Sequence, residues 1–134
     1  MIVVDSNVIA YCWVNGPLTA LAQRVRTRDP DWHVPILWRS EMRSILTGYL
    51  RDGSLTAPHT ARIMEAAEGA LAGREHLVSS ALVFEIADKS RLSAYDCEFV
   101  ALAAVLTVPL VTADRAVLKA FPDRALTMET FTRT

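Results

Sequence analysis

The segment SAYDCEFVALAAVLTVPLVTAD, which runs from Ser93 to Asp114, places the most apolar helix of the chain directly before a compact strand. Ser93 is a good N-cap, and the apolar run that follows is so continuous that the helix must be mostly buried. Residues 109–112 (PLVT) then read as a short buried strand. A buried helix that leads into a buried strand is typical of an α/β sandwich around a parallel sheet.

The same alternation extends to both sides of this segment. Apolar periodicity, Gly and Pro breaks and capping residues predict strands at 2–4, 33–35, 76–78, 109–112 and 125–127, and helices at 7–14, 17–28, 36–51, 57–71, 80–90, 94–107 and 115–121. We therefore expect an α/β fold with a mainly parallel central sheet flanked by helices. No repeat or linker interrupts the pattern, so we expect one domain over residues 1–134.

Composition excludes several classes of protein. The hydrophobic content of 51% is that of a packed globular chain, yet no apolar run approaches the ~20 residues that span a bilayer. The first residues lack the basic start of a signal peptide, which favours the cytoplasm. Cys12 and Cys97 have no zinc-site spacing, so we expect buried thiols, although the sequence leaves one bridge open.

Net charge does not point to nucleic acid. The formal charge is -1, so any contact with RNA must come from a local group of the 14 Lys and Arg residues. Arg24, Arg26 and Arg28 alternate along one predicted helix and spread around it, which is typical of a solvated face. The function must be inferred from particular side chains.

Three acids fall on one edge of the predicted sheet. Asp5 follows the first strand, Asp114 lies two residues beyond the strand ending at Thr112, and Asp96 is in the first turn of the apolar helix. In right-handed βαβ units, helix N-termini lie at the edge formed by the carboxyl ends of the strands. We therefore expect these three carboxylates to meet.

Glu41 is placed to join them. It lies about a turn and a half into the predicted helix 36–51, roughly 8 Å from its start at 1.5 Å per residue. It sits at the margin of an apolar stripe, and Arg39 and Arg43 project to a different face. The predicted stripe consists of Trp38, Met42, Ile45, Leu46 and Tyr49.

Four converging acids require a cation or raised pKa values. Two carboxylates ~5 Å apart repel by roughly 3 kcal/mol at an effective dielectric of 20. Oxygen ligands favour magnesium or manganese, and His33, His59 and His76 lack the spacing of a zinc site. A divalent ion at such a site suits hydrolysis of phosphodiesters, with one ion or two.

Each acid also has a structural interpretation. Asp96 with Ser93 matches a capping box, and Asp114 is placed to cap the following short helix. Asp5 would equally suit a turn, and Glu41 a solvated position on its helix. Because four independent structural roles would meet at one edge only by chance, the joint interpretation as a site is favoured. Glu98 lies about 200° around the helix from Asp96, so we expect it on a supporting or dimer surface.

The chain resembles the PIN-domain ribonucleases, and within them the VapC-type toxins of bacterial toxin-antitoxin pairs. The resemblance is carried by 3–8 (VVDSNV), by Glu41 in the expected helix, by 95–103 (YDCEFVALA) and by 109–114 (PLVTAD), so it spans nearly the whole chain. Leu118 departs from relatives that carry a polar or acidic residue there, which makes a second metal ion less secure.

The resemblance implies a function. It implies a Mg²⁺-dependent or Mn²⁺-dependent endoribonuclease that cuts structured RNA, inhibits translation, works as a homodimer and is inactivated by a VapB-type antitoxin encoded beside it. Asp5, Glu41, Asp96 and Asp114 would be its catalytic and metal-binding residues. Asn7 and Thr112 would be supporting polar residues near the metal.

Two alternatives stay open at this point. The strand that ends in 5–8 (DSNV) partly imitates the nucleophile motif of haloacid-dehalogenase phosphatases, but Asn7 cannot act as the general acid that this chemistry needs. A noncatalytic PIN-like binding module is the second alternative, because intact acids do not prove turnover.

Overall fold

The computed structural model describes residues 1–133 of the chain. Its strands are β1 (Ile2–Val4), β2 (Trp32–Pro35), β3 (Glu75–His76), β4 (Leu110–Val111) and β5 (Ala125–Leu126). Its helices are α1 (Ser6–Trp13), α2 (Thr19–Arg28), α3 (Trp38–Arg51), α4 (Ala57–Ala70), α5 (Ser80–Lys89), α6 (Ala94–Leu106), α7 (Arg115–Ala120) and α8 (Met128–Thr132).

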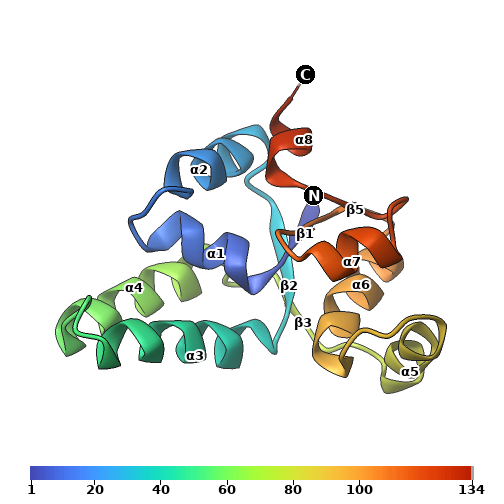
Figure 1. The fold of residues 1–134 in the computed structure, drawn as a ribbon, viewed down its shortest axis with the longest axis horizontal. Helices are drawn as coiled ribbons and strands as arrows, with labels where there is room; N and C mark the ends of the chain where they lie inside the picture. Colours follow the sequence, from blue (N-terminus) through green and yellow to red (C-terminus); the bar gives the residue numbers. More distant parts are fainter. Residues whose placement is uncertain (134) are drawn as a thin grey trace.

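The strands form one parallel sheet in the order β3-β2-β1-β4-β5. β1 is central and entirely buried, as its run of Ile and Val requires for a strand covered on both faces. Helices α1 to α4 lie on one side of the sheet and α5 to α7 on the other (Figure 1). The predicted fold class, an α/β sandwich with a parallel sheet flanked by helices, is confirmed.

Helices α6 and α1 both bring residues to the site, and they pack against different elements. α6 buries six side chains, from Cys97 to Ala103, and contacts β1, β2 and β4, so its apolar sequence is explained by its central place. α1 begins immediately after β1 and packs on α2 and α3. Both helices begin at the edge formed by the carboxyl ends of the strands, and that edge holds the site.

Several details differ from the sequence-based expectations. α3 begins at Trp38 instead of Ile36, because the Ile36 amide still bonds to the His76 carbonyl and extends the sheet contact. β3 lies at residues 75–76 instead of 76–78. Tyr49, expected in the core stripe of α3, is 38% exposed.

The structure adds a short helix near the end of the chain and leaves both thiols free. Helix α8, with Thr127 as its N-cap, was not expected, since five residues carry too little periodicity to predict a helix. Cys12 and Cys97 are both buried and both free, so no disulfide joins them. Within residues 1–133, no helix is both long and apolar enough to cross a membrane.

Candidate functional site

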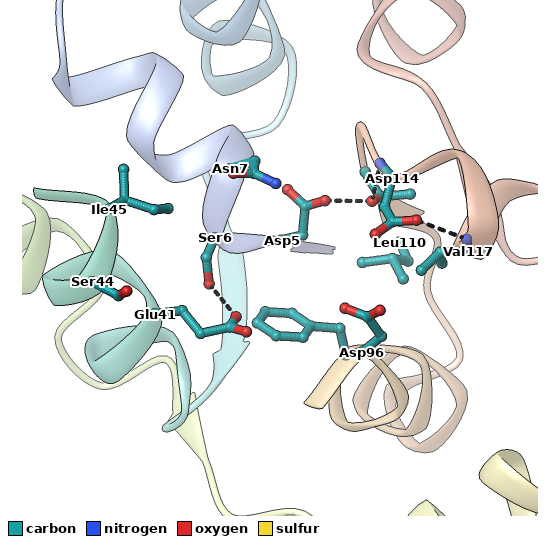
Figure 2. A pocket seen from close by; sticks show the side chains of 12 residues that line it. Asp5, Ser6, Asn7, Glu41, Ser44, Ile45, Asp96, Leu110, Asp114 and Val117 are labelled. Atoms are coloured by element: carbon teal, nitrogen blue, oxygen red, sulfur yellow. Dashed lines mark hydrogen bonds between the residues drawn. The ribbon is translucent and has the colours of Figure 1, made fainter. Parts of the chain in front are cut away.

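A pocket of about 320 Å³ opens at the carboxyl ends of β1 and β4. Four acids from four separate parts of the chain line it, together with small polar and apolar side chains: Asp5, Ser6, Asn7, Glu41, Ser44, Ile45, Asp96, Phe99, Leu110, Thr112, Asp114 and Val117. In Figure 2 the carboxylates of Asp5, Asp96 and Asp114 lie around one space, and Glu41 extends toward it from α3. The structure thus brings together all four acids that the sequence analysis selected.

Asp5 is the most firmly held of the four. It caps α1, where its Oδ1 accepts a hydrogen bond of 2.9 Å from the Val8 amide. Its Oδ2 accepts hydrogen bonds from the Thr112 hydroxyl and, at 3.2 Å, from the Ala113 amide. Burial raises the pKa of Asp5 above its ordinary 3.8, while these three bonds act in the opposite direction. The carboxylate therefore ties β1 to the loop after β4.

Asp114 combines a structural contact with a free oxygen. Its Oδ1 caps α7 by accepting from the amides of Ala116 (2.8 Å) and Val117 (3.1 Å). Its own amide donates to the hydroxyl of Thr112 at 3.0 Å. In residues 1–133 its Oδ2 accepts no hydrogen bond. The capping role expected of Asp114 is therefore real, and it leaves one oxygen available to the pocket.

The carboxylate of Asp96 does not cap a helix, unlike that of Asp114. Ser93 caps α6 by accepting from the Asp96 amide at 3.1 Å, and the Ser93 side chain also bonds to the Asp96 carboxylate. Within residues 1–133 that carboxylate accepts nothing from the Ser93 backbone amide and forms no ion pair. The reciprocal half of the capping box is therefore absent from this part of the chain. Burial raises the pKa of Asp96, the negative charge of Asp114 raises it further, and the hydrogen bond with Ser93 acts in the opposite direction. This carboxylate lines the pocket and has Ser93, at the start of its own helix, as its neighbour.

Glu41 reaches the pocket from the first turn of α3. Its Oε1 accepts a hydrogen bond of 2.7 Å from the hydroxyl of Ser6, which is itself buried. Burial raises the pKa of Glu41, the Ser6 bond lowers it, and the charges of Asp96 and Asp5 raise it again. The mutual repulsion expected of converging acids is thus present.

The pocket acids carry no compensating positive charge from the protein. Within residues 1–133, none of the four forms an ion pair with a lysine, arginine or histidine. A set of carboxylate oxygens without basic partners fits a hard divalent cation, which favours oxygen ligands. The donor chemistry of the site therefore fits a metal such as Mg²⁺ or Mn²⁺.

Without a metal ion, the four carboxylates are nevertheless not arranged as a complete set of metal ligands. Within the described residues, no group of three or more His, Cys, Asp or Glu side chains is arranged to hold a metal ion. Like charges repel, so carboxylates have no reason to converge on one point before a cation neutralises them. One oxygen of Asp114 and one of Glu41 are also turned to Val117 and Ser6.

The sequence analysis predicted some of the residues that surround the pocket acids and missed others. Thr112 touches Asp5, while Asn7 lines the pocket without a hydrogen bond to the acids in the described chain. Glu98 is half-buried and lines a neighbouring cleft with Ile36, Leu77 and Phe84. Ser6 was missed: its partner Glu41 is 35 residues away, and no local pattern marks that contact.

A parallel α/β domain with four acids gathered at the carboxyl edge of its sheet has a site that fits a metal-dependent hydrolase. The PIN domain family matches residues 2–122, and the chain therefore belongs to that family. PIN domains are generally metal-dependent nucleases, so a nuclease is the coarse function. Family membership also removes the phosphatase alternative, which required a different fold family.

Comparison with solved structures agrees on the fold. The crystal structure of PAE2754 from Pyrobaculum aerophilum matches with a TM-score of 0.78 over 98% of this chain and 92% of that one, at 18% sequence identity. At such identity the likeness shows the architecture alone. No curated protein sequence matches the chain.

Proposed function

We propose that the chain is an endoribonuclease toxin of the VapC type, dependent on Mg²⁺ with Mn²⁺ as a substitute, that acts in the cytoplasm. The observation that carries the proposal is the gathering of Asp5, Glu41, Asp96 and Asp114 in one pocket, where none of them forms an ion pair with a basic side chain of residues 1–133. Such a pocket attracts a divalent cation, and a cation there suits the negative charge of a phosphodiester.

Asp5, Asp96 and Asp114 would hold the cation, with Glu41 beside them. When bound, the metal would offset phosphate charge, promote ionisation of water and stabilise the leaving 3′ oxygen. Asp5 has the least freedom to move, because three hydrogen bonds fix it, and it would set the position of the others.

Glu41 is suited to accept a proton. It lies beside the three aspartates in the pocket, and the Ser6 hydroxyl orients its carboxylate. In the hydrolysis, a water oxygen forms a bond to phosphorus, the bond from phosphorus to the 3′ oxygen breaks, and Glu41 takes the proton of the water. The leaving oxygen ends as a hydroxyl by taking a proton from solvent.

The proposed homodimer is supported by one exposed apolar surface. Ile36, Leu77, Phe84 and Tyr95, here called the apolar face, surround a cleft at the carboxyl ends of β2 and β3. Their exposed fractions run from 50% at Ile36 to 87% at Leu77. Large exposed apolar side chains that gather on one surface mark protein interfaces. We propose that a second copy of the chain covers this face.

The antitoxin partner rests on the resemblance to VapC toxins. A small reading frame beside the gene whose product binds the chain and stops RNA cleavage would support this part of the proposal. The absence of such a neighbour would count against the toxin assignment and leave the nuclease assignment in place.

RNA cleavage in vitro tests the central proposal. The wild-type chain with Mg²⁺ or Mn²⁺ should cut RNA, and the Asp5→Asn and Asp96→Asn variants should not, while both keep the circular dichroism spectrum of the wild type. Full activity of both variants would overturn the proposed site. RNA binding without cleavage in either metal would instead support a noncatalytic module. Mapping of RNA ends after brief expression would identify the target.

A further inference from the structure

The first turn of α3 lacks the usual means of fixing a helix start. Asp5 caps α1 and Ser93 caps α6, but Leu37, the N-cap of α3, makes no side-chain capping bond. The residue that depends on this turn is Glu41, which lies in it. Something outside the helix must hold the turn in place.

Glu75, from the edge strand β3, makes that contact. Its Oε2 accepts hydrogen bonds from Trp38 Nε1 at 2.7 Å and from Arg39 Nε at 2.6 Å. Its Oε1 accepts a third bond, of 2.8 Å, from Arg39 Nη2. Arg39 Nη1 also binds Glu68 of α4 at 2.5 Å. One carboxylate therefore holds the first two residues of α3 by three bonds.

The surroundings make these bonds stronger than those of an ordinary surface pair. Trp38 is fully buried, and the side chain of Glu75 is only 17% exposed. The two-pronged contact of Arg39 with Glu75 is the geometry in which guanidinium and carboxylate bind best. The bond from Arg39, the largest influence, lowers the pKa of Glu75, so the carboxylate stays charged at neutral pH.

We propose that Glu75 and Arg39 are positioning residues of the active site, which hold the first turn of α3 so that Glu41 faces the acid pocket. This inference rests on the proposed function, because it takes Glu41 to serve the metal site. Trp38 and Glu41 are three residues apart, so they lie close to one face of the helix. A shift of Trp38 away from Glu75 would carry Glu41 with it.

A second ion pair supplies the matched control. Arg74, directly before β3, donates to Asp31, directly before β2, at 2.9 Å. This pair links the residues that precede β3 and β2, and within residues 1–133 the side-chain bonds of Arg74 go to Asp31 and Ala70 and not to α3. Arg39→Met removes the charged bonds between β3 and α3, and Arg74→Met removes a charged bond beside the same strand that does not involve α3. Only the first should affect Glu41.

Mn²⁺ binding, measured by calorimetric titration of the full chain without RNA, tests the inference. Loss of groups that orient metal ligands costs about 10–100-fold in affinity, so Arg39→Met and Glu75→Gln should each weaken Mn²⁺ binding by about tenfold. Arg74→Met should leave it within about twofold of the wild type. Arg39→Lys, which keeps the charge without the two-pronged contact, should fall between. Thermal unfolding of each variant ensures that the titration is run on folded protein.

Glu41→Gln separates the inference from the proposed function. If Glu41→Gln weakens Mn²⁺ binding while Arg39→Met and Glu75→Gln bind like the wild type, the positioning role is wrong and the metal site stands. If Glu41→Gln itself binds like the wild type, the proposed role of Glu41 fails first. Equal weakening by Arg39→Met and Arg74→Met would also overturn the inference, because it would show a general effect of lost stability.

Discussion

The hydroxyl of Thr112 donates a hydrogen bond to Oδ2 of Asp5, although 107 residues separate them in the chain. The same hydroxyl oxygen accepts a bond of 3.0 Å from the amide of Asp114. One threonine, 1% exposed at the end of β4, thus fixes two of the four pocket acids relative to each other. The contact gives a first prediction.

Thr112→Val should weaken Mn²⁺ binding most at low pH. Valine keeps the shape of threonine but removes the donor that lowers the pKa of Asp5, so that pKa should rise further. Because a metal binds the deprotonated carboxylate, the pH at which Mn²⁺ binding is half-maximal should move upward. Titrations across the acid range check this, with Thr112→Ser as the control that restores the donor. An unchanged pH profile for Thr112→Val would contradict it.

Asp96→Asn should stabilise the metal-free protein at neutral pH. The folded-state pKa of Asp96 is raised, so between its ordinary value of 3.8 and the raised value the native state binds more protons than the unfolded chain. Stability therefore falls as pH rises through that window, and the cost persists above it. The neutral amide removes this cost, and the melting temperature should rise by roughly 4 °C per kcal/mol gained.

Two controls accompany that measurement. The exposed Asp123, changed to Asn, should leave the melting temperature at pH 7 unchanged. Mn²⁺ should raise the melting temperature of the wild type and have little effect on Asp96→Asn. A metal-free Asp96→Asn variant that melts with or below the wild type would show that the pocket carries no such strain.

Glu75→Gln should lose stability at neutral pH and lose none in acid. The folded-state pKa of Glu75 is lowered by Arg39, so its contribution is present above the ordinary value of 4.5 and disappears as pH falls through the lowered value. Urea unfolding of the wild type and the variant, repeated as the pH is lowered stepwise from 7 into the acid range below the ordinary pKa of 4.5, measures the difference. Glu65→Gln, an exposed acid on α4, is the control. A difference between wild type and Glu75→Gln that persists in acid would assign the effect to packing instead of charge.

Phe84→Asp should convert the proposed homodimer into a monomer. Phe84 is 67% exposed within the apolar face, and a carboxylate buried there without a partner would oppose association. Val105→Asp changes an apolar side chain of similar exposure, 62%, that does not line the same cleft, so it should leave the dimer intact. Sedimentation velocity of the three proteins decides this. A monomeric wild type would refute the proposed dimer.

The sequence predicted much of the fold because its signals are local. A continuous apolar run predicted α6, and Ser93 and Thr56 correctly indicated where α6 and α4 begin. Gly73, predicted to stop α4, has a positive φ of 79°, a conformation that favours glycine. Tyr49 was placed wrongly because periodicity shows which face of α3 is apolar but not how far along the helix the core extends. The edge of the sheet at which the acids meet followed from the handedness of βαβ units.

The sequence by itself therefore determined the order of strands and helices along the chain as far as β5, the parallel sheet and the edge that holds Asp5, Asp96 and Asp114. Only the tertiary structure decided which side chains support the acids: Ser6 on Glu41, Thr112 on Asp5, and Glu75 on the start of α3. The physical reason is distance along the chain. Hydrogen bonds between residues 35 or more positions apart depend on how short strands pair and helices pack, and no local sequence pattern encodes that.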